Sequence, residues 1–159
     1  MATVYLGLGT NLGNKQENLN VALQQIEKQI GKPFSLSAFY ETAPWGFHSE
    51  NTFLNAVVGV ETSLSPFRLL QITQQIEKES GRKLKSVAGS YEDRIIDIDL
   101  LLVGDMTVNT SELSLPHPFM TERLFVMEPL AEIAPDLVHP VLKIPMKEIL
   151  IQLKLKKQV

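Results

Sequence analysis

Two aspartates at the start of an apolar run are the first candidates for chemistry. Asp97 and Asp99 lie two residues apart in the run DIDLLLV, and side chains two apart in a β-strand point to the same face. At about 3.3 Å of rise per residue, their backbones lie roughly 6.6 Å apart. Paired carboxylates suit Mg²⁺, which takes its remaining ligands from water and phosphates. The alternative is structural, with both carboxylates held by salt bridges to Arg94 or a nearby lysine.

The strand that carries these aspartates is otherwise apolar. Ile96, Ile98 and Leu100 fall on one face, and Leu101 and Val103 continue the face of the aspartates. This pattern predicts a central strand that is covered on both faces. Two buried carboxylates without partners would be costly there, so we expect a positive group to compensate them.

Other polar residues could join the aspartates. Gln74 and Glu77 lie three apart on one face of a predicted helix, where a surface role is the alternative. Arg82 and Lys85 fall in a polar loop that leads directly to the aspartates. Cations beside a carboxylate pair suit phosphoryl-type transfer, which depends on positioning and charge stabilisation. His117 lies between prolines that would hold it against a ligand, although lone histidines are commonly structural.

Two further stretches invite a binding function. The glycines of GLGTNLGN precede a predicted helix but match no phosphate-loop motif, so we interpret them as a structural connection. Phe53 and Asn55 share one face of a predicted strand, so a ring and an amide could meet one ligand. The alternative for Phe53 is an ordinary place in the core.

Composition limits the classes of protein. The 159 residues, 44% of them apolar, predict a single domain over residues 1–159. The chain has no cysteine, which favours a cytoplasmic location over export. No apolar run approaches the length of a membrane span, and a net charge of −3 argues against a nucleic-acid partner.

The periodicity predicts an alternation of strands and helices. Helices are expected from Asn14 to Gly31, where Asn14 and Glu17 form a capping box, and from the Ser65 cap to Gly81. Strands are expected at residues 3–9, 34–42, 52–62, 96–103 and 107–109, followed by short helices from residue 116 onward. The order β-α-β-β-α-β with a helical tail predicts an α+β fold. Its architecture would be a ferredoxin-like α/β sandwich with a mainly antiparallel sheet and helices packed on it.

Several blocks of the chain together resemble one family. In chain order they are GLGTNLGN, FYETAPWG, FLNAVVGVET, IEKESGR, DRIIDIDLLL and LPHPFMTERLFVMEPLAEIAP. They resemble the 6-hydroxymethyl-7,8-dihydropterin pyrophosphokinases of folate biosynthesis, over roughly residues 3 to 150. The resemblance implies a ferredoxin-like fold and transfer of pyrophosphate from ATP to the pterin hydroxymethyl group, with AMP as the other product.

The resemblance also implies a role for particular residues. Asp97 and Asp99 would bind two Mg²⁺ ions, and Arg82 and Arg94 match two arginines associated with catalysis. The expected contacts to ATP are Gln74, Glu77, Lys85, Ile98, Ser114, His117 and Arg123. The expected contacts to the pterin are Thr42, Ala43, Trp45, Phe53, Asn55 and Phe125. Departures at Leu84, Ser90, Glu92 and Glu112 put the contribution of the 82–94 loop in doubt.

Two classes of function therefore remain at this stage. The first is an ATP-dependent pterin pyrophosphokinase that works as a monomer on its two small substrates. The second is a ferredoxin-like ligand-binding or regulatory module, because this fold hosts many unrelated functions. Release of AMP that depends on both Mg²⁺ and reduced pterin would distinguish them.

Overall fold

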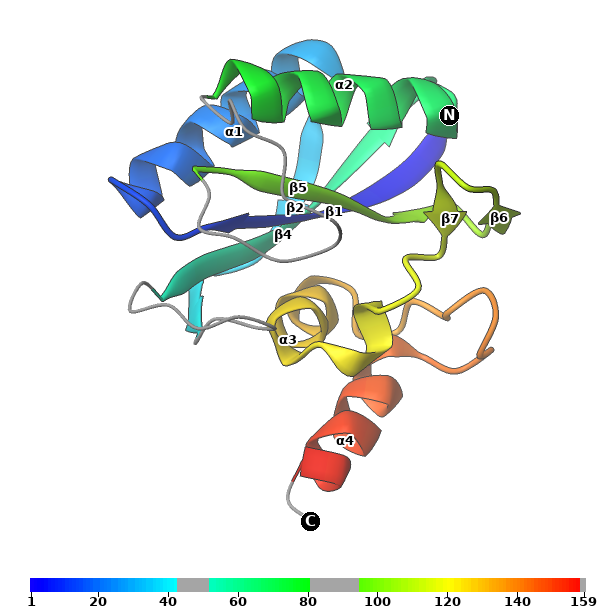
Figure 1. Ribbon diagram of the computed structural model, residues 1–159. Coiled ribbons are helices and arrows are strands. Elements are labelled where there is room, and N and C mark those ends of the chain that lie inside the picture. The colour runs from blue at the N-terminus through cyan, green and yellow to red at the C-terminus, as the bar shows by residue number, and fades with distance from the viewer. Residues whose placement is uncertain (43–51, 81–94, 158–159) are drawn as a thin grey trace.

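The structure is a computed structural model that describes residues 1–42, 52–80 and 95–157 of the 159. Within these ranges, two layers of helices enclose one antiparallel sheet (Figure 1). The strands are β1 (Ala2–Thr10), β2 (Pro33–Leu36), β3 (Tyr40–Thr42), β4 (Phe53–Thr62), β5 (Asp97–Val103), β6 (Val108–Asn109) and β7 (Ser114–Leu115). The helices are α1 (Lys15–Gln29), α2 (Pro66–Glu79), α3 (Leu124–Ile133) and α4 (Met146–Lys157), with a 3-10 turn, η1, at Met120–Glu122.

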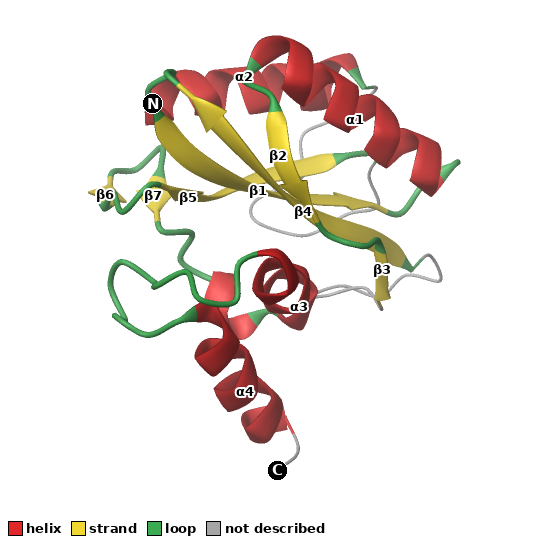
Figure 2. Ribbon diagram, turned by 180° about the vertical axis from the view of Figure 1, so that it is seen from behind, coloured by secondary structure: helices red, strands yellow, loops and turns green. Residues whose placement is uncertain are grey.

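The main sheet has the strand order β2-β4-β1-β5, and β3 pairs with the other end of β4 (Figure 2). With β2 and β3 taken as one interrupted strand, this is the order of a ferredoxin-like β-α-β-β-α-β unit. The predicted α+β fold with a mainly antiparallel sheet is therefore confirmed.

The two predicted helix starts are also confirmed. The Asn14 side chain accepts a hydrogen bond from the Glu17 amide, and Ser65 caps α2 by accepting from the Arg68 amide. Pro66 follows at the first position of α2, where its fixed φ suits a helix and its missing N–H is not needed. These caps fix where the helices leave the sheet.

Three details of the predicted strands were wrong. The single strand expected over 34–42 is two strands, because the Ser37 side chain interrupts the pairing with β4: its hydroxyl accepts from the Val57 amide and donates to the Ala38 carbonyl. Strand β7 was not predicted, and it pairs with β6 in a separate hairpin. Strand β5 lies at the end of the sheet order rather than in its centre, although helices cover both of its faces.

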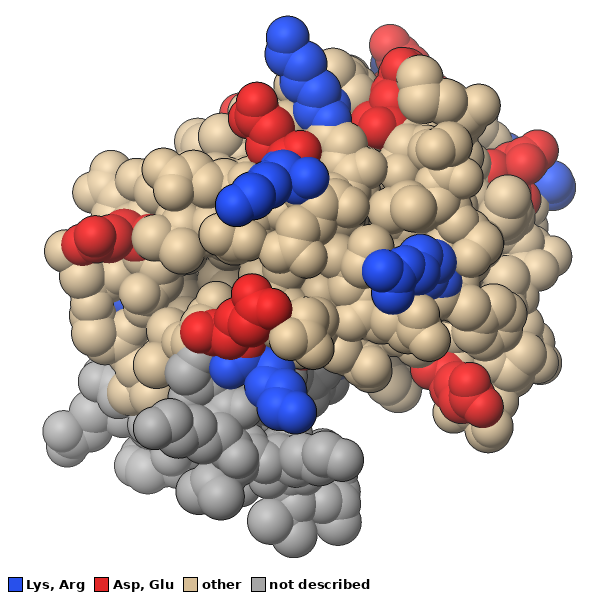
Figure 3. Space-filling model, turned by 90° about the horizontal axis from the view of Figure 1, so that it is seen from above, with Lys and Arg blue, Asp and Glu red and all other residues tan. Residues whose placement is uncertain are grey.

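Each face of the sheet has its own apolar core. Beneath α1 and α2 lie residues such as Leu6, Leu8 and Leu19, all buried. On the opposite face, Leu101 packs with Met127 and other residues of α3 and α4. The outer surface of the α1 and α2 layer carries acidic and basic side chains interspersed, with no large patch of one sign (Figure 3). Over the described ranges, no helix combines the length and hydropathy that a membrane span requires.

Candidate active site

The centre of the candidate site is a row of cross-strand neighbours on the face of the sheet toward α3. In the register of the sheet, Gly9 of β1 lies opposite Asn55 of β4 on one side and opposite Asp97 of β5 on the other. Gly7 lies opposite Asp99 in the same way. The middle strand contributes no side chain at these two positions, and we call the row formed by Asn55, Gly9 and Asp97 the trough.

Gly9 is fitted closely to this trough. A Cβ atom at this position would lie 3.0 Å from Asn55 Oδ1 and 3.6 Å from the ring of Phe53. Phe53 and Asn55 therefore lie on one face of β4, as their spacing predicts. The stretch GLGTNLGN was interpreted only as a structural connection. The close approach of Gly9 to Asn55 is a second structural role, which comparison with phosphate-loop motifs could not reveal.

The Asn55 amide has a fixed orientation. Its Nδ2 donates to Thr42 Oγ1 of β3 at 2.7 Å, and the residue is only 4% exposed. Since the amide nitrogen is turned toward Thr42, its oxygen is the atom that lies near Gly9. This geometry turns an acceptor toward the trough, which suits a ligand edge that carries N–H donors.

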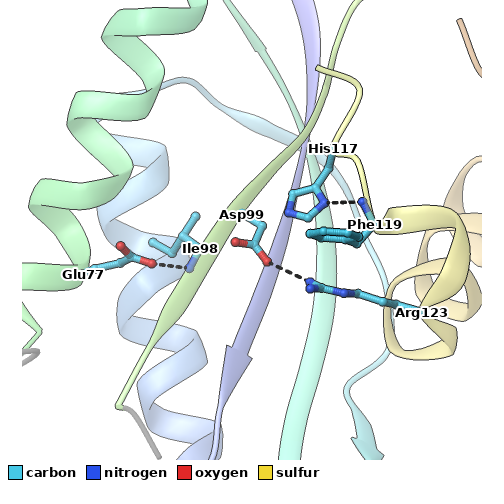
Figure 4. Close-up of polar contacts among 6 residues, drawn as sticks. All are labelled: Glu77, Ile98, Asp99, His117, Phe119 and Arg123. Carbon is cyan, nitrogen blue, oxygen red and sulfur yellow. Dashed lines mark hydrogen bonds and ion pairs between the residues drawn. The ribbon is translucent and has the colours of Figure 1, made fainter. Parts of the chain in front are cut away.

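The two aspartates are half-buried and have a positive neighbour. Arg123 Nη1 lies 3.9 Å from Asp99 Oδ2, and the side chains are 2% and 30% exposed respectively (Figure 4). A positive group was expected at this point, but the partners proposed for it were Arg94, which lies outside the described residues, or a nearby lysine. The ion pair supports the structural alternative for Asp99 and also leaves a carboxylate accessible to a ligand.

Arg123 is held in place by aromatic rings. Its guanidinium lies over the rings of Phe119 and Phe125, with its carbon 5.4 Å from each ring centroid. Such cation–π contacts gain strength when the cation is removed from water. The turn η1 and the start of α3 therefore present a desolvated positive charge to the aspartates of β5 (Figure 4).

His117 is a neutral hydrogen-bond donor at physiological pH. Burial and the charge of Arg123 lower its pKa to about 4, against a smaller opposing effect of Asp97. Its Nδ1 accepts from the Phe119 amide at 3.2 Å, which places the proton of the neutral ring on Nε2. The His117 amide donates to Leu101 O at 2.9 Å, so this residue is anchored beside β5.

The expected nucleotide contacts fall into two groups. A cavity of about 480 Å³ is lined by Ser114 and His117, together with other residues of the β6–β7 hairpin and with His139, Val141 and Leu142. Glu77 instead lies on α2, where its Oε2 accepts from the Ile98 amide at 2.8 Å (Figure 4). Strand β5 separates the two groups, and the side chain of Ile98 is buried, so any contact from Ile98 to a ligand must use its main chain.

The remaining histidine that the structure describes has a structural function. His139 is buried, and its Nδ1 accepts from the amides of Val141 and Leu142. Gln74 is exposed on α2. Ala43, Trp45, Arg82, Lys85 and Arg94 lie outside the described residues, so their roles stay predictions.

The pair of aspartates suits a hard divalent cation that takes most of its ligands from water and substrate. It does not form a metal centre whose ligands all come from the protein. Across the residues that the structure describes, no group of three or more His, Cys, Asp or Glu side chains gathers in one place. Mg²⁺ is characteristically bound by one or two carboxylates, with water and substrate phosphates as its other ligands. The donor set therefore fits Mg²⁺ brought by a nucleotide.

Comparison with known proteins gives a consistent result. Residues 5–135 match the family model described as 7,8-dihydro-6-hydroxymethylpterin-pyrophosphokinase. The 2-amino-4-hydroxy-6-hydroxymethyldihydropteridine pyrophosphokinase of Porphyromonas gingivalis is 51% identical over 141 residues, which cover 88% of this chain and 95% of the relative. The enzyme of the same name from Aquifex aeolicus is 43% identical over 150 residues, covering 93% and 90% of the two chains.

A solved structure matches the fold over nearly the whole chain. Plasmodium falciparum HPPK-DHPS with SDX-DHP superposes with a TM-score of 0.82 at 20% identity. The match covers 99% of this chain and 45% of that one. At this level of identity, the likeness supports the arrangement of strands and helices alone.

Proposed function

Because the chain belongs to the 7,8-dihydro-6-hydroxymethylpterin-pyrophosphokinase family, we propose that it transfers pyrophosphate from ATP to 6-hydroxymethyl-7,8-dihydropterin. The pterin hydroxymethyl oxygen attacks the β-phosphorus of ATP and loses its proton. The bond from that phosphorus to the bridging oxygen of the α-phosphate breaks, so AMP and the pterin diphosphate are the products. Relatives of this chain include proteins named for folic acid synthesis, and we assign the reaction to that pathway.

The observation that carries this proposal is the row Asn55–Gly9–Asp97. It has an amide acceptor and a carboxylate on opposite sides of one strand position that carries no side chain. A flat heterocycle bound at Asn55 would thus have its substituent near the aspartates. Reactions of this kind depend on such positioning, because the protein holds the reacting groups in line.

The proposed pterin site combines one amide with two aromatic rings. Asn55 Oδ1 would accept from the N–H edge of the pterin, and Phe53 and Phe125 would lie against its rings. Stacking of this kind is worth roughly 0.5–1.5 kcal/mol beyond burial. Thr42 holds the amide of Asn55, and Ala43 and Trp45 complete the proposed site.

The phosphates would bind beside β5. His117 can donate from Nε2 without changing its charge, because its pKa of about 4 keeps it neutral. Arg123 and the proposed Arg82, Lys85 and Arg94 would balance the negative charge of the triphosphate. We assign the nucleoside contacts to Gln74, Glu77, Ile98 and Ser114.

Asp97 and Asp99 would hold two Mg²⁺ ions. Bound Mg²⁺ neutralises phosphate charge and lowers the pKa of a nearby hydroxyl. The chain's own contribution is to fix the two carboxylates on one strand, with Arg123 3.9 Å from Asp99.

We also propose that the chain is one domain that acts as a monomer in the cytoplasm, without a nucleic-acid partner. The absence of cysteine and the net charge of −3 support this setting. The reaction itself requires only the two small substrates.

The test is release of AMP from ATP by the purified chain. AMP should form only when Mg²⁺ and 6-hydroxymethyl-7,8-dihydropterin are both present. Asp97→Asn should lower turnover by about 10³-fold or more, as expected when charge stabilisation is removed from a phosphoryl-type transfer. The matched control is Asp105→Asn, which neutralises an exposed carboxylate after β5 and should keep parental turnover. Pterin binding by the parent without AMP release would instead favour the ligand-binding module.

A further inference from the structure

We propose that Glu132, on the last turn of α3, is a positioning residue for the pterin. It holds the short strand that orients Asn55 and ties that strand to the helix that carries Phe125. This inference rests on the proposed function, because it assigns Glu132 a role in the pterin site of that same reaction. Neither the sequence pattern nor the resemblance pointed to this residue.

Glu132 accepts hydrogen bonds from two groups of a distant segment, the Ala38 amide and the Tyr40 hydroxyl. The Ala38 amide donates to both carboxylate oxygens, at 3.2 Å to Oε1 and 3.1 Å to Oε2. The Tyr40 hydroxyl donates to Oε1 at 2.6 Å. These contacts join α3 to Ala38, two positions before β3, and to Tyr40, the first residue of β3; both lie more than 90 positions away in the sequence. A short hydrogen bond to an ionised acceptor is among the stronger kinds.

The held strand leads directly to the proposed pterin contacts. Tyr40 lies opposite Asn55 in the register of β3 and β4, and Thr42 lies opposite Phe53. Thr42 Oγ1 then accepts from Asn55 Nδ2 at 2.7 Å. Since β3 has only three residues, its own ladder gives it little stability. Glu132 supplies a fixed attachment that keeps Thr42 at the distance Asn55 needs.

The other end of the helix carries Phe125, the second aromatic residue of the proposed pterin site. Phe125 is in the first turn of α3 and Glu132 is in the last. The ring of Phe125 also packs against the guanidinium of Arg123. One helix therefore links Phe125 to the segment that carries β3. The Glu132 contacts then set the spacing between Phe125 and Asn55. A flat ligand held between two walls is sensitive to that spacing.

The Tyr40 hydroxyl keeps its proton at neutral pH. The hydrogen bond to Glu132 raises the pKa of Tyr40 to about 12, with smaller contributions from burial and from the charges of Glu132 and Glu128. The phenol therefore remains a donor at neutral pH. Glu128 lies one turn earlier on α3, and of the interactions described it acts on Tyr40 through charge alone. It is the matched control for loss of one carboxylate from this helix.

The experiment compares the parent with Glu132→Ala, Glu132→Gln, Tyr40→Phe and Glu128→Ala. Dissociation constants for the pterin and for a non-hydrolysable ATP analogue with Mg²⁺ are measured by calorimetry, and KM and kcat by AMP release. Glu132→Ala should weaken pterin binding by about tenfold, the scale of one lost hydrogen bond to a charged group. Nucleotide binding should stay within about twofold, and kcat should change less than the KM for the pterin.

The other variants separate the hydrogen bonds from the charge. Tyr40→Phe keeps the Ala38 contacts and should weaken pterin binding by about threefold, roughly half of the expected free-energy change. Glu132→Gln keeps an acceptor for Tyr40 and should fall between the parent and Glu132→Ala. Glu128→Ala should bind the pterin as the parent does.

Two results would overturn the inference. One is parental pterin affinity in both Glu132→Ala and Tyr40→Phe. The other is an equal loss for pterin and nucleotide with a lowered Tm, since that would show a general structural role. If Glu132→Ala does not fold, Tyr40→Phe decides between these outcomes. A parent that binds the pterin without forming AMP would contradict the proposed reaction but not the role of Glu132 in binding, whereas a parent that does not bind the pterin would contradict both.

Discussion

The face of the sheet beneath α1 and α2 and the face toward α3 differ in what the central strand β1 contributes to each. On the first face, β1 presents Leu6 and Leu8, which are buried in a continuous apolar core. On the second, it presents Gly7 and Gly9, and polar residues of the neighbouring strands border the space above them. The alternation Leu-Gly-Leu-Gly thus places large side chains on one side of the strand and none at the alternate positions on the other.

Because of this difference, we expect the first face to contribute mainly to stability and the polar part of the second mainly to ligand binding. The first face removes large apolar side chains from water, which is the main favourable contribution to folding. The second face keeps carboxylates, an amide and a guanidinium in a partly buried position, where each depends on its partners. Substitutions on the two faces should therefore produce different kinds of loss.

The largest expected effect on stability comes from the core beneath α1. Leu19→Ala removes a fully buried side chain and should lower the free energy of unfolding by about 3 to 4 kcal/mol, because the cavity closes only in part. Urea unfolding measures this loss. Asn20→Ala, on the exposed side of the same helix, is the control and should change stability little. A large fall in kcat for folded Leu19→Ala would show that the two faces are coupled.

A second prediction concerns pH and the polar face. The folded-state pKa of His117 is about 4, below the ordinary value of about 6.5. As pH falls below about 6.5, the unfolded chain takes up a proton that the folded chain does not, so stability falls. The contribution is fully present above about pH 6.5, is lost between about pH 6.5 and 4, and amounts to at most about 3 kcal/mol.

The measurement is the difference in unfolding free energy between the parent and His117→Gln from pH 7.5 to 4. That difference cancels other groups that titrate in the same range, such as His139, whose pKa burial also lowers. The stability of the parent should fall more steeply than that of the variant. Parallel curves would mean that His117 is accessible to protonation in the folded chain.

Much of the fold could be predicted because its signals are local. The caps at Asn14 and Ser65 depend on residues within three positions, and the apolar periodicity of the long strands needs no knowledge of neighbours. The break at Ser37 could not be predicted in this way, because it depends on the Val57 amide of another strand. The position of β5 at the end of the sheet order is likewise a property of the whole topology.

The site shows the same division. The shared face of Asp97 and Asp99 follows from strand alternation, and so does that of Phe53 and Asn55. The contact of Arg123 with Asp99 needs the path of η1 and α3 across the sheet. Glu132 gives no signal in the sequence, because it is exposed, as a glutamate near the end of a helix ordinarily is. Only the fold brings it to the Ala38 amide and the Tyr40 hydroxyl.

The smallest expected effect tests the trough itself. Gly9→Ala places a methyl group 3.0 Å from Asn55 Oδ1, so the amide must move by a few tenths of an ångström against its bond to Thr42. We expect pterin affinity to fall by about fivefold, near 1 kcal/mol, while the nucleotide binds as before. Gly7→Ala is the matched control on the same strand and face. Its Cβ would meet only the Leu101 side chain at 3.5 Å, an ordinary contact, and pterin affinity should stay within about twofold of the parent. If both variants bound the pterin equally well, the trough would not depend on Gly9. The difference between the two faces would then depend on β4 and β5 alone, because Asn55 and Asp97 would define the site whatever side chain β1 placed between them.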